Sequence, residues 1–589
     1  MQRMTIPESA ANTSDGAGRG HPKSFIWQVL TGPWFMLFAT LLIMSVNGTS
    51  YMFGLYSNGI KSYFGYDQTT LNLLGFYKDL GGNLGVVSGF IYELAPPWAV
   101  LLIGALMNFS SYFTVSLAIT GGIPKPPIWQ MCLYTCFGAN SLSFPNTGAL
   151  VTCVKNFPEN RGIVIGLLKG FIGLSGAIIT QIYHASFGDD PEKVILLIAC
   201  LPTAVSLVFI RVIRITKVSH RVKEVAIFYR LLYIALGLAG FLTIVIILQT
   251  RIKFTRYEYV GSALVVLMML ILPLGFIVNE ETKVRKAEIK CLPNDLPSEV
   301  VLVNQPPGRT SLPEATPNPP RKLDPLSRLG DILRPPKRGE DHSILQAIFN
   351  IDMLIIIIST TCGVGGILAV IDNLGQIGSS LGYPPRSIAA FISLVSIWNF
   401  LGRVFAGFYS EYLLTKYKLP RPAMLAAILL FTCVGHGLLA CAVPNSLYIT
   451  TMIMGFCLGV QLPLVCTIIS EVYGLKHFST LYNVGSVSSP IGSYIFNVKV
   501  AGHLYDKEAL RQLRASGLTR RAGDPLSCTG IKCYQTAFII ITAATFFGCL
   551  VSLALVLRTR KFYKGDIYAR FREDRENSAA TSDVTPGRN

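Results

Sequence analysis

Residues 161–185 read RGIVIGLLKGFIGLSGAIITQIYHA, and Lys169 is the only charged residue between Arg161 and His184. An α-helix rises about 1.5 Å per residue, so a helix of this length crosses a hydrocarbon core about 30 Å thick. Comparable apolar runs recur along nearly the whole chain. The stretch therefore predicts a membrane-spanning helix, and its recurrence predicts a protein that crosses the membrane many times.

The composition of the chain points the same way. It has 589 residues, of which 51% are hydrophobic and 14% charged, and its mean hydropathy is +0.48. Soluble domains contain about 25% charged residues, so a conventional soluble enzyme, a disordered chain and a fibrous chain are all excluded. The net charge of +18 is spread over many loops and forms no basic stripe. It therefore predicts no nucleic-acid partner.

The apolar runs predict an all-α polytopic membrane protein with about fourteen spans, arranged as six, two and six. The expected spans are residues 33–56, 72–94, 97–119, 128–151, 161–185, 192–213, 228–250, 258–279, 350–372, 387–410, 423–443, 448–471, 478–499 and 535–557. A polar, proline-rich segment separates the central pair from the last six. It has too little apolar surface to fold, so we expect a flexible linker there.

This pattern divides the chain into six segments. They are a cytoplasmic tail (1–32), a six-helix bundle (33–214), an inserted two-helix segment (215–280), a cytoplasmic linker (281–343), a second six-helix bundle (344–557) and a disordered cytoplasmic tail (558–589). With the N-terminus in the cytoplasm, most of the 51 Lys and Arg residues fall on the cytoplasmic side, as the positive-inside rule requires. We therefore expect both termini in the cytoplasm, in a plasma or vacuolar membrane.

Lys169 is the charge that the composition does not explain. It lies near the middle of its expected span, and it shares a helical face with Gly162 and Gly166. A charged side chain at this depth is costly unless it meets a partner, so it marks a candidate functional site. That partner is either a bound anion or a protein carboxylate. The opposite face is apolar and is expected to face lipid: Leu167, Phe171, Leu174 and Ile178.

Uncharged polar residues gather within other expected spans. The set that we expect to shape a cavity is Asn47, Tyr51, Asn140, Asn146 and Gln461. Polar side chains beside Pro or Gly inside a span are typical of broken helices around a water-filled site, although hydrogen bonds between helices also account for them. Lys78 is a further candidate ligand contact, and its neighbour Asp79 offers an ion pair instead.

The cysteines and the motifs of the chain favour a protein without enzyme activity. Most of the 13 cysteines lie inside expected spans, but Cys528 and Cys533 share the last expected exterior loop. They form either a disulfide or two free thiols. The chain shows no spacing typical of a metal site, no cofactor motif, no G-x-S-x-G motif and no nucleotide-binding G-K-[ST] motif. We therefore expect no metal, no cofactor and no enzyme activity.

The end of the tenth expected span carries a recognisable motif, Gly402-Arg403-Val-Phe-Ala-Gly407-Phe-Tyr-Ser-Glu411. It resembles the G-R-x-x-x-G-x-x-x-D/E signature of the major facilitator superfamily, and it falls at the expected cytoplasmic end of the second helix of a half. The resemblance implies that Gly402, Arg403, Gly407 and Glu411 serve a cytoplasmic gate. The first half has a partial copy, Gly89-x-x-x-Glu93, which lacks the basic residues. We include Glu93 in the expected gate.

Further segments resemble the plant nodulin-like branch of that superfamily. They include Gly81-Gly-Asn-Leu-Gly85, Phe157-Pro-Glu-Asn-Arg161-Gly162, Leu168-Lys169-Gly170, Ile371-Asp-Asn-Leu-Gly-Gln376 and Ser470-Glu471-Val-Tyr473-Gly474. The resemblance covers nearly the whole chain and implies a plant source. The branch is similar at the superfamily level to monocarboxylate and oxalate/formate carriers, so it leans toward small organic anions.

We expect a monomeric secondary transporter that works by alternating access and holds a small organic anion at Lys169. A proton or an exchanged anion is a candidate coupling partner, proton coupling is the weaker hypothesis, and uniport stays open as well. The alternatives are a transporter of a neutral solute, such as a sugar or amino acid, and a non-transporting membrane sensor or scaffold. A sealed bundle with no cavity beside Lys169 would favour the sensor.

Overall fold

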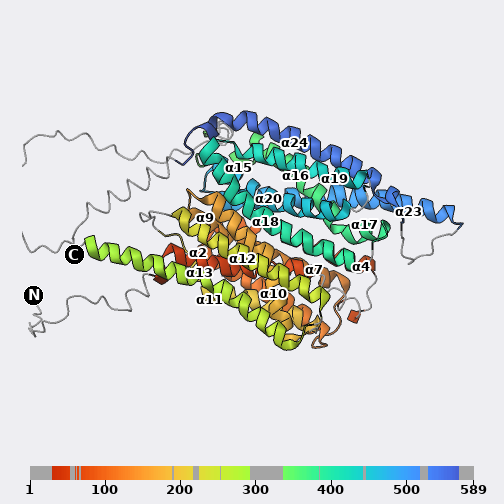
Figure 1. The fold of residues 1–589 in the computed structure, drawn as a ribbon, viewed down its shortest axis with the longest axis horizontal. Coiled ribbons are helices and arrows are strands. Elements are labelled where there is room, and N and C mark those ends of the chain that lie inside the picture. Colours follow the sequence, from red (N-terminus) through yellow and green to blue (C-terminus); the bar gives the residue numbers. More distant parts are fainter. Residues whose placement is uncertain are drawn as a thin grey trace, which may run out of the picture.

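The computed structural model describes residues 29–53, 60, 63–64, 68–188, 191–216, 224–252, 254–291, 336–383, 385–441, 443, 446–517 and 528–568. These residues form one elongated bundle of helices, and none of them lies in a strand (Figure 1). The predictions for residues 1–28, 292–335 and 569–589, which cover most of the expected tails and linker, lie outside the described residues.

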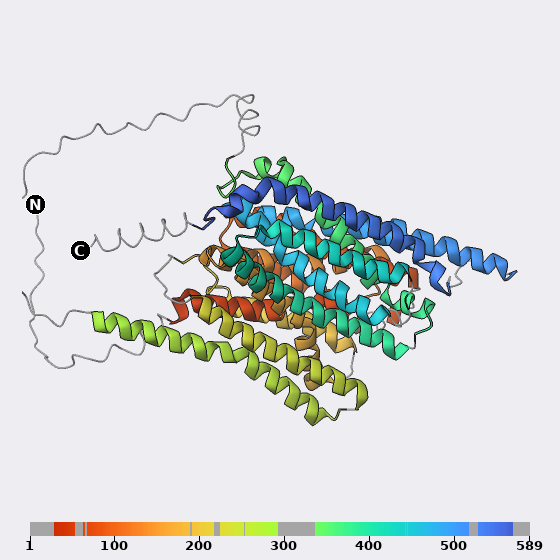
Figure 2. The same ribbon diagram turned by 45° about the horizontal axis from the view of Figure 1, so that its top comes forward.

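The first half of the chain forms a bundle in which several helices are interrupted. Its elements are α2 (Pro33–Ser45), the 3-10 turn η1 (Thr49–Met52), α4 (Gln68–Asn83), α5 (Val86–Leu94), α6 (Pro97–Ile119), α7 (Ile128–Asn140), α8 (Ser143–Pro145), the π-helix η2 (Asn146–Val151), α9 (Thr152–Asn156), α10 (Arg161–Phe187) and α11 (Pro191–Phe209). The inserted pair is α12 (Glu224–Arg251) and α13 (Arg256–Cys291). Both helices pack on α10 and lie beside the first half in both views (Figures 1 and 2).

The second half forms the other bundle. Its elements are α15 (Ile344–Ile348), α16 (Ile351–Asp372), α17 (Leu374–Ser380), α18 (Pro385–Tyr417), α19 (Arg421–Ala440), α20 (Ser446–Tyr473), α21 (Phe478–Ser486), α22 (Ser488–Ser493), the π-helix η3 (Tyr494–Gly502), α23 (His503–Ala515), the 3-10 turn η4 (Ile531–Cys533) and α24 (Gln535–Lys564). A capping box opens α15, where the Ser343 side chain accepts from the Gln346 backbone and the Gln346 side chain accepts in return.

Two of the expected boundaries between segments fall inside helices of the structure. Residues 281–291, expected in the linker, continue α13, and residues 558–564, expected in the disordered tail, continue α24. The α24 extension ends on Lys561 and Lys564 in its last turn, where cations interact favourably with the helix dipole. Charged residues lowered the local hydropathy there without ending the helix.

Within the described part of the chain, eight helices are long and apolar enough to cross a membrane: α6, α10, α12, α13, α16, α19, α20 and α24. Two more apolar helices are shorter, α2 and residues Lys193–Phe209 of α11. The remaining expected spans fall on α4 with α5, on the series from α7 to η2, on α18, and on the series from α21 to η3. The total of about fourteen spans therefore stays a prediction.

The breaks in these helices fall where Gly, Pro and polar residues meet. Pro145 directly precedes the π-helix η2, and a proline without an N–H loosens the helical hydrogen bonding around it. Between α4 and α5, the Asn140 amide donates to the carbonyls of Gly81 (3.0 Å) and Leu84 (2.7 Å). These bonds satisfy backbone groups that the break exposes.

Glycines allow a close backbone approach between the two halves at the crossing of α10 with α18. A Cβ built on Gly166 would lie 2.5 Å from the Cα of Gly407, so only glycine fits there. Small residues that let helix backbones touch are typical of packing in membranes. The face of α10 expected to meet lipid is instead buried, because α2, α12 and α13 pack on this helix: Leu167, Phe171, Leu174 and Ile178.

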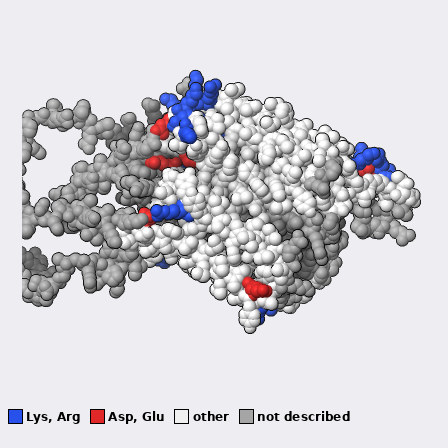
Figure 3. Space-filling view, in the orientation of Figure 1, with Lys and Arg blue, Asp and Glu red and all other residues white. Residues whose placement is uncertain are grey.

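The bundle has two ends, which we name after residues near them. The Arg421 end contains the start of α10, the end of α18 and the end of α24, and the α23 end contains α17 and α23 (Figure 1). On the face shown in Figure 3, most of the described Lys, Arg, Asp and Glu side chains lie toward the left and right ends, with a further charged patch at the lower edge, and they leave an uncharged belt across the middle. Such a belt is what a bilayer requires.

Candidate functional site

A cavity of about 200 Å³ lies between the two halves at the level of Lys169. The first half supplies Asn47, Gly48, Gly82, Asn83, Gly85, Leu142, Ser143, Asn146, Lys169 and Ile172. The second half supplies Thr360, Arg403, Leu462, Val465, Cys466, Tyr482, Asn483, Gly485, Ser486, Ser488 and Ser489. Both bundles therefore build one wall each, so any relative movement of the halves changes the site.

Lys169 reaches across the cavity from α10 to the opposite half. Its ammonium donates a hydrogen bond of 2.5 Å to the Tyr482 hydroxyl on α21 and lies 4.7 Å from the centre of that ring. A protein carboxylate was one of the two expected partners of Lys169. In the described part of the chain, no carboxylate is among its contacts. The protein partner of Lys169 is instead a neutral hydroxyl and an aromatic ring.

Arg403, which the resemblance assigns to a cytoplasmic gate, also lines the cavity, and its gating role stays a prediction. Its Nη1 donates to the backbone carbonyl of Lys169 (2.7 Å), and its Nε donates to the Asn399 side chain (2.6 Å). The expected span ended at residue 410, but α18 continues to Tyr417. Arg403 is therefore about 21 Å of helix away from the end of α18.

The charges on the described cavity wall have one sign. Lys169 and Arg403 are the charged residues among the described lining residues, and no carboxylate is among them. Asn146 adds a polar atom, because its Oδ1 is buried with no hydrogen-bond partner among the described residues. A cavity that focuses positive charge between low-dielectric walls attracts a negatively charged ligand.

Two of the expected amides reach the cavity. Asn47 and Asn146 line it, and both donate to the backbone carbonyl of Leu142, at 3.0 and 2.9 Å. These bonds hold the carboxamides beside the break between α7 and η2. Tyr51 belongs to η1, and its side chain lies outside the described part of the structure.

The other expected contacts lie elsewhere. Asn140 faces the backbone between α4 and α5. Gln461 is fully buried inside the second half, where it donates to Thr432 at 3.4 Å. Lys78 pairs with Asp79 at 2.9 Å. These three are absent from the described cavity wall, because the helix rotation that decides which side faces the cavity comes from packing against neighbours.

The expected substrate-binding set left out several polar residues of the second-half wall. Tyr482 and Asn483 face the first half, and the Asn483 amide donates to Thr147 at 2.9 Å. Gly85 approaches Asn483 so closely that a Cβ there would lie 2.1 Å from its Oδ1. The signal in the sequence was the run of small residues from Gly485 to Ser489 inside an expected span.

A buried charge cluster closes the Arg421 end. Arg421 is 1% exposed and bonds both Glu411 and Glu471, the latter at 2.8 Å from its Nε. The Tyr563 hydroxyl donates to Glu471 at 2.9 Å. Arg421, and not Arg403, is therefore the base that meets Glu411. Two residues of this cluster, Arg421 and Glu471, were not among the expected gating residues.

The first half touches this cluster through Arg161. Its Nη1 donates to the carbonyl of Ser470 (2.8 Å), and its guanidinium lies 5.2 Å from the Tyr568 ring. The Tyr568 hydroxyl donates to Glu471 at 3.0 Å. The end of the described chain thereby joins the two halves at this end.

Glu93 forms a second contact between the halves at the Arg421 end. Its carboxylate lies 2.8 Å from His477 Nδ1 and accepts from the Ser479 hydroxyl at 2.5 Å. Nearby, a Cβ on Gly89 would lie 2.9 Å from the Cα of Thr480. The partial motif of the first half, Gly89-x-x-x-Glu93, thus contacts the start of α21 in the second half. The partners of Glu93 come from the second half, so the motif forms this contact without basic residues of its own.

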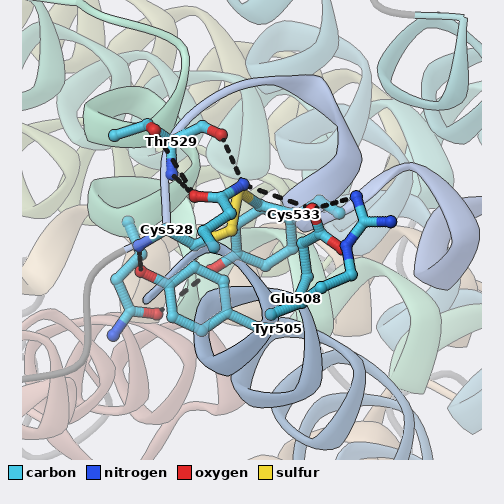
Figure 4. Close-up of a disulfide and its surroundings, with 9 residues drawn as sticks. Tyr505, Glu508, Cys528, Thr529 and Cys533 are labelled. Carbon is cyan, nitrogen blue, oxygen red and sulfur yellow. Dashed lines mark hydrogen bonds and ion pairs between the residues drawn. A yellow bond between two sulfur atoms is a disulfide. The ribbon is translucent and has the colours of Figure 1, made fainter. Parts of the chain in front are cut away.

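Cys528 and Cys533 form a disulfide beside α23 (Figure 4). The backbone N–H of Cys528 donates to the Tyr505 hydroxyl at 3.0 Å, and the Thr529 N–H donates to the Gln512 side chain at 3.0 Å. The backbone N–H of Gly530 donates to the carbonyl of Ser380 at 2.9 Å. These bonds hold the loop against α17 and α23, away from the cavity.

Comparison with known proteins supports one family for the chain. Residues 33–278 match a family model described as Nodulin-like, and residues 344–565 match one described as NFD4, C-terminal domain. The chain is 25% identical over 542 residues to Protein NUCLEAR FUSION DEFECTIVE 4 of Arabidopsis thaliana, covering 90% of this chain and 89% of that protein. It is 20% identical over 463 residues to Probable transporter MCH1 of Wickerhamomyces anomalus, covering 78% and 77%.

Among solved structures, a double-tryptophan variant of XylE has a TM-score of 0.51 at 12% identity, covering 92% of this chain and 96% of that one. XylE is described as a proton:xylose symporter of the major facilitator superfamily. At this identity the likeness concerns the fold alone. The chain belongs to the nodulin-like family and has the fold of the major facilitator superfamily.

Proposed function

We propose that the protein is a secondary transporter that moves a small organic anion by alternating access. The observation that carries the proposal is the charge of the central cavity, where Lys169 and Arg403 face the site and no carboxylate is among the described lining residues. A carboxylate is a stronger acceptor for an ammonium than a phenol hydroxyl is. An anion entering the cavity would therefore replace Tyr482 as the partner of Lys169.

The size of the cavity supports a small substrate. Pockets for drug-sized ligands run from about 300 to 1,000 Å³, and this one is about 200 Å³. Asn47 and Asn146 offer neutral polar groups at the same wall. We infer that they bind the uncharged part of a short carboxylate.

The contacts between the halves support alternating access with two bundles as the moving bodies. Hydrogen bonds join the halves at the Arg421 end through Arg161 and Glu93. We infer that this state is closed at the Arg421 end, and we assign that end to the cytoplasm from the distribution of Lys and Arg along the sequence. Opening that end requires Glu93 to leave His477 and Arg161 to leave Ser470.

The cavity also bears on the coupling partner. A proton symporter needs a group that takes up a proton near the substrate, and carboxylates do this in many transporters. None is present on the described wall, which favours exchange of one anion for another. Substrates such as pyruvate and lactate are suitable probes.

The test is uptake of labelled short carboxylates into proteoliposomes, with the same vesicles preloaded with unlabelled anion or given a proton gradient. We expect Lys169→Met to abolish saturable uptake and Lys169→Arg to keep part of it, because only the second keeps the positive charge. Lys561→Met, which changes an exposed lysine at the end of α24, is the matched control.

Unchanged uptake and unchanged KM in Lys169→Met would contradict the proposal. Uptake of a neutral sugar or amino acid that all three variants retain would identify a different substrate class. Folding of each variant is checked by its elution as a single peak in detergent.

A further inference from the structure

A second hollow lies on the side of the bundle, and its lining residues differ from those of the central cavity. It measures about 420 Å³ and runs between α12 of the inserted pair and α18 of the second half. Its wall is apolar and aromatic, with Tyr229, Leu232 and Leu236 on α12 and Phe405, Phe408 and Tyr412 on α18. This groove lies largely within the expected spans of both helices, so in a membrane it faces the acyl chains of the lipids.

The groove is built by aromatic packing. The Tyr229 and Phe408 rings lie 5.4 Å apart and bridge the two helices, while Phe405 stacks on Tyr409 at 4.5 Å. The lining positions of α18 reach from residue 401 to 412, which is about 17 Å of helix. A channel of that length matches one acyl chain entering from the Arg421 end.

A cation stands at the open end of the groove. The Lys416 ammonium donates to the Tyr412 hydroxyl at 2.8 Å and lies close to the rings of Tyr412 and Tyr417. Arg230, which follows Tyr229 on α12, pairs with Glu280 on α13 at 2.8 Å. Lys416 is thus the charge that faces an incoming head group, and basic residues between membrane helices attract anionic lipids.

We propose that this groove binds an anionic phospholipid, with one acyl chain between α12 and α18 and the phosphate at Lys416. The site lies between a helix that packs on the first half and a helix of the second half. Movement of the halves changes its width, so a bound lipid favours the state closed at the Arg421 end. This gives the inserted helices a role that is independent of the transported substrate.

The experiment is native mass spectrometry of the delipidated full-length protein, titrated with dioleoyl phosphatidylglycerol or dioleoyl phosphatidylcholine. We expect the first lipid to bind about five times more tightly than the second, and Lys416→Gln to remove that preference, since one basic residue near a membrane surface contributes a factor of this order. Leu236→Trp, which fills the groove, should weaken both lipids.

Matched controls use exposed positions on α24, away from the groove. They are Leu557→Trp, at a side chain that is 74% exposed, and Lys561→Gln. Equal affinity for the two lipids in the unmodified protein, or an unchanged preference in Lys416→Gln, would overturn the proposal. Displacement of the phosphatidylglycerol by cholesterol at equal concentration would also overturn it, because the groove would then be a sterol site.

Discussion

At the scale of the residue, the central finding is how the protein holds Lys169. Its ammonium meets the Tyr482 hydroxyl and ring, and Arg403 binds its backbone carbonyl. Both contacts cross between the halves, since Lys169 lies on α10 and the two partners lie on α21 and α18. A ligand that takes the ammonium therefore also loosens one link between the bundles.

Replacing the Tyr482 hydroxyl tests this competition. In Tyr482→Phe the ammonium keeps the ring but loses its acceptor, so a carboxylate no longer displaces a hydrogen bond. A hydrogen bond contributes about 1 kcal/mol net, and we expect KM for anion uptake to fall about fivefold. Tyr494→Phe, at a tyrosine that is 48% exposed, is the control. A raised KM in Tyr482→Phe would mean that the hydroxyl binds the substrate directly.

At the scale of the element, two features of the helices decide the architecture. Broken helices, such as α4 with α5 and α7 with η2, place polar groups beside the cavity. Glycines bring α10 and α18 together, with Gly166 against Gly407. The sequence indicates both features as Gly and Pro inside apolar runs, but it does not state which helix is the partner of which.

Adding one methyl group at the crossing tests the second feature. In Gly166→Ala the new Cβ would lie 2.5 Å from the Gly407 Cα, and such overpacking costs about 1–3 kcal/mol. We expect a lower midpoint of thermal unfolding in detergent and slower uptake. Gly240→Ala in α12 is the control, because nothing lies within 4 Å of a Cβ there. Equal loss in both variants would show that the close contact is not the cause.

At the scale of the whole molecule, the distribution of contacts between the halves selects one state. The Arg421 end is joined by Glu93 with His477 and by Arg161 with Ser470. The Arg421 cluster itself lies within the second half and fixes the ends of α18, α19 and α20 against each other. The cluster therefore holds the second half together at this end, and weakening the links between the halves should change the population of states more than it changes stability.

Glu93→Gln tests this at the level of the whole transporter. The variant loses its charged acceptor for His477 and Ser479, which is worth about 1.4 kcal/mol, or a tenfold shift. Cys466 lines the cavity, so its labelling by an impermeant thiol reagent added at the Arg421 end should rise about tenfold. Glu508→Gln on α23 is the control, and Cys466→Ser identifies the labelled site. Unchanged labelling in Glu93→Gln would contradict a gate at this position.

The sequence predicted well what depends on composition along one stretch of chain. Apolar runs predicted the helices, because burial in lipid requires an apolar side chain at nearly every position. The likeness to the nodulin-like family and the prominence of Lys169 follow from local residue patterns. The ends of the helices were less well predicted, because α18 and α24 continue through charged residues to Tyr417 and Lys564.

The sequence by itself thus determined that the chain is a helical membrane protein of the major facilitator type, with one lysine in the middle of a span. Only the tertiary structure decided that Arg403 faces the cavity while Arg421 meets Glu411, and that Gln461 and Asn140 do not reach the described cavity wall. The physical reason is that burial in lipid is decided residue by residue, whereas the direction of a side chain depends on helix rotation and on which helices pack together.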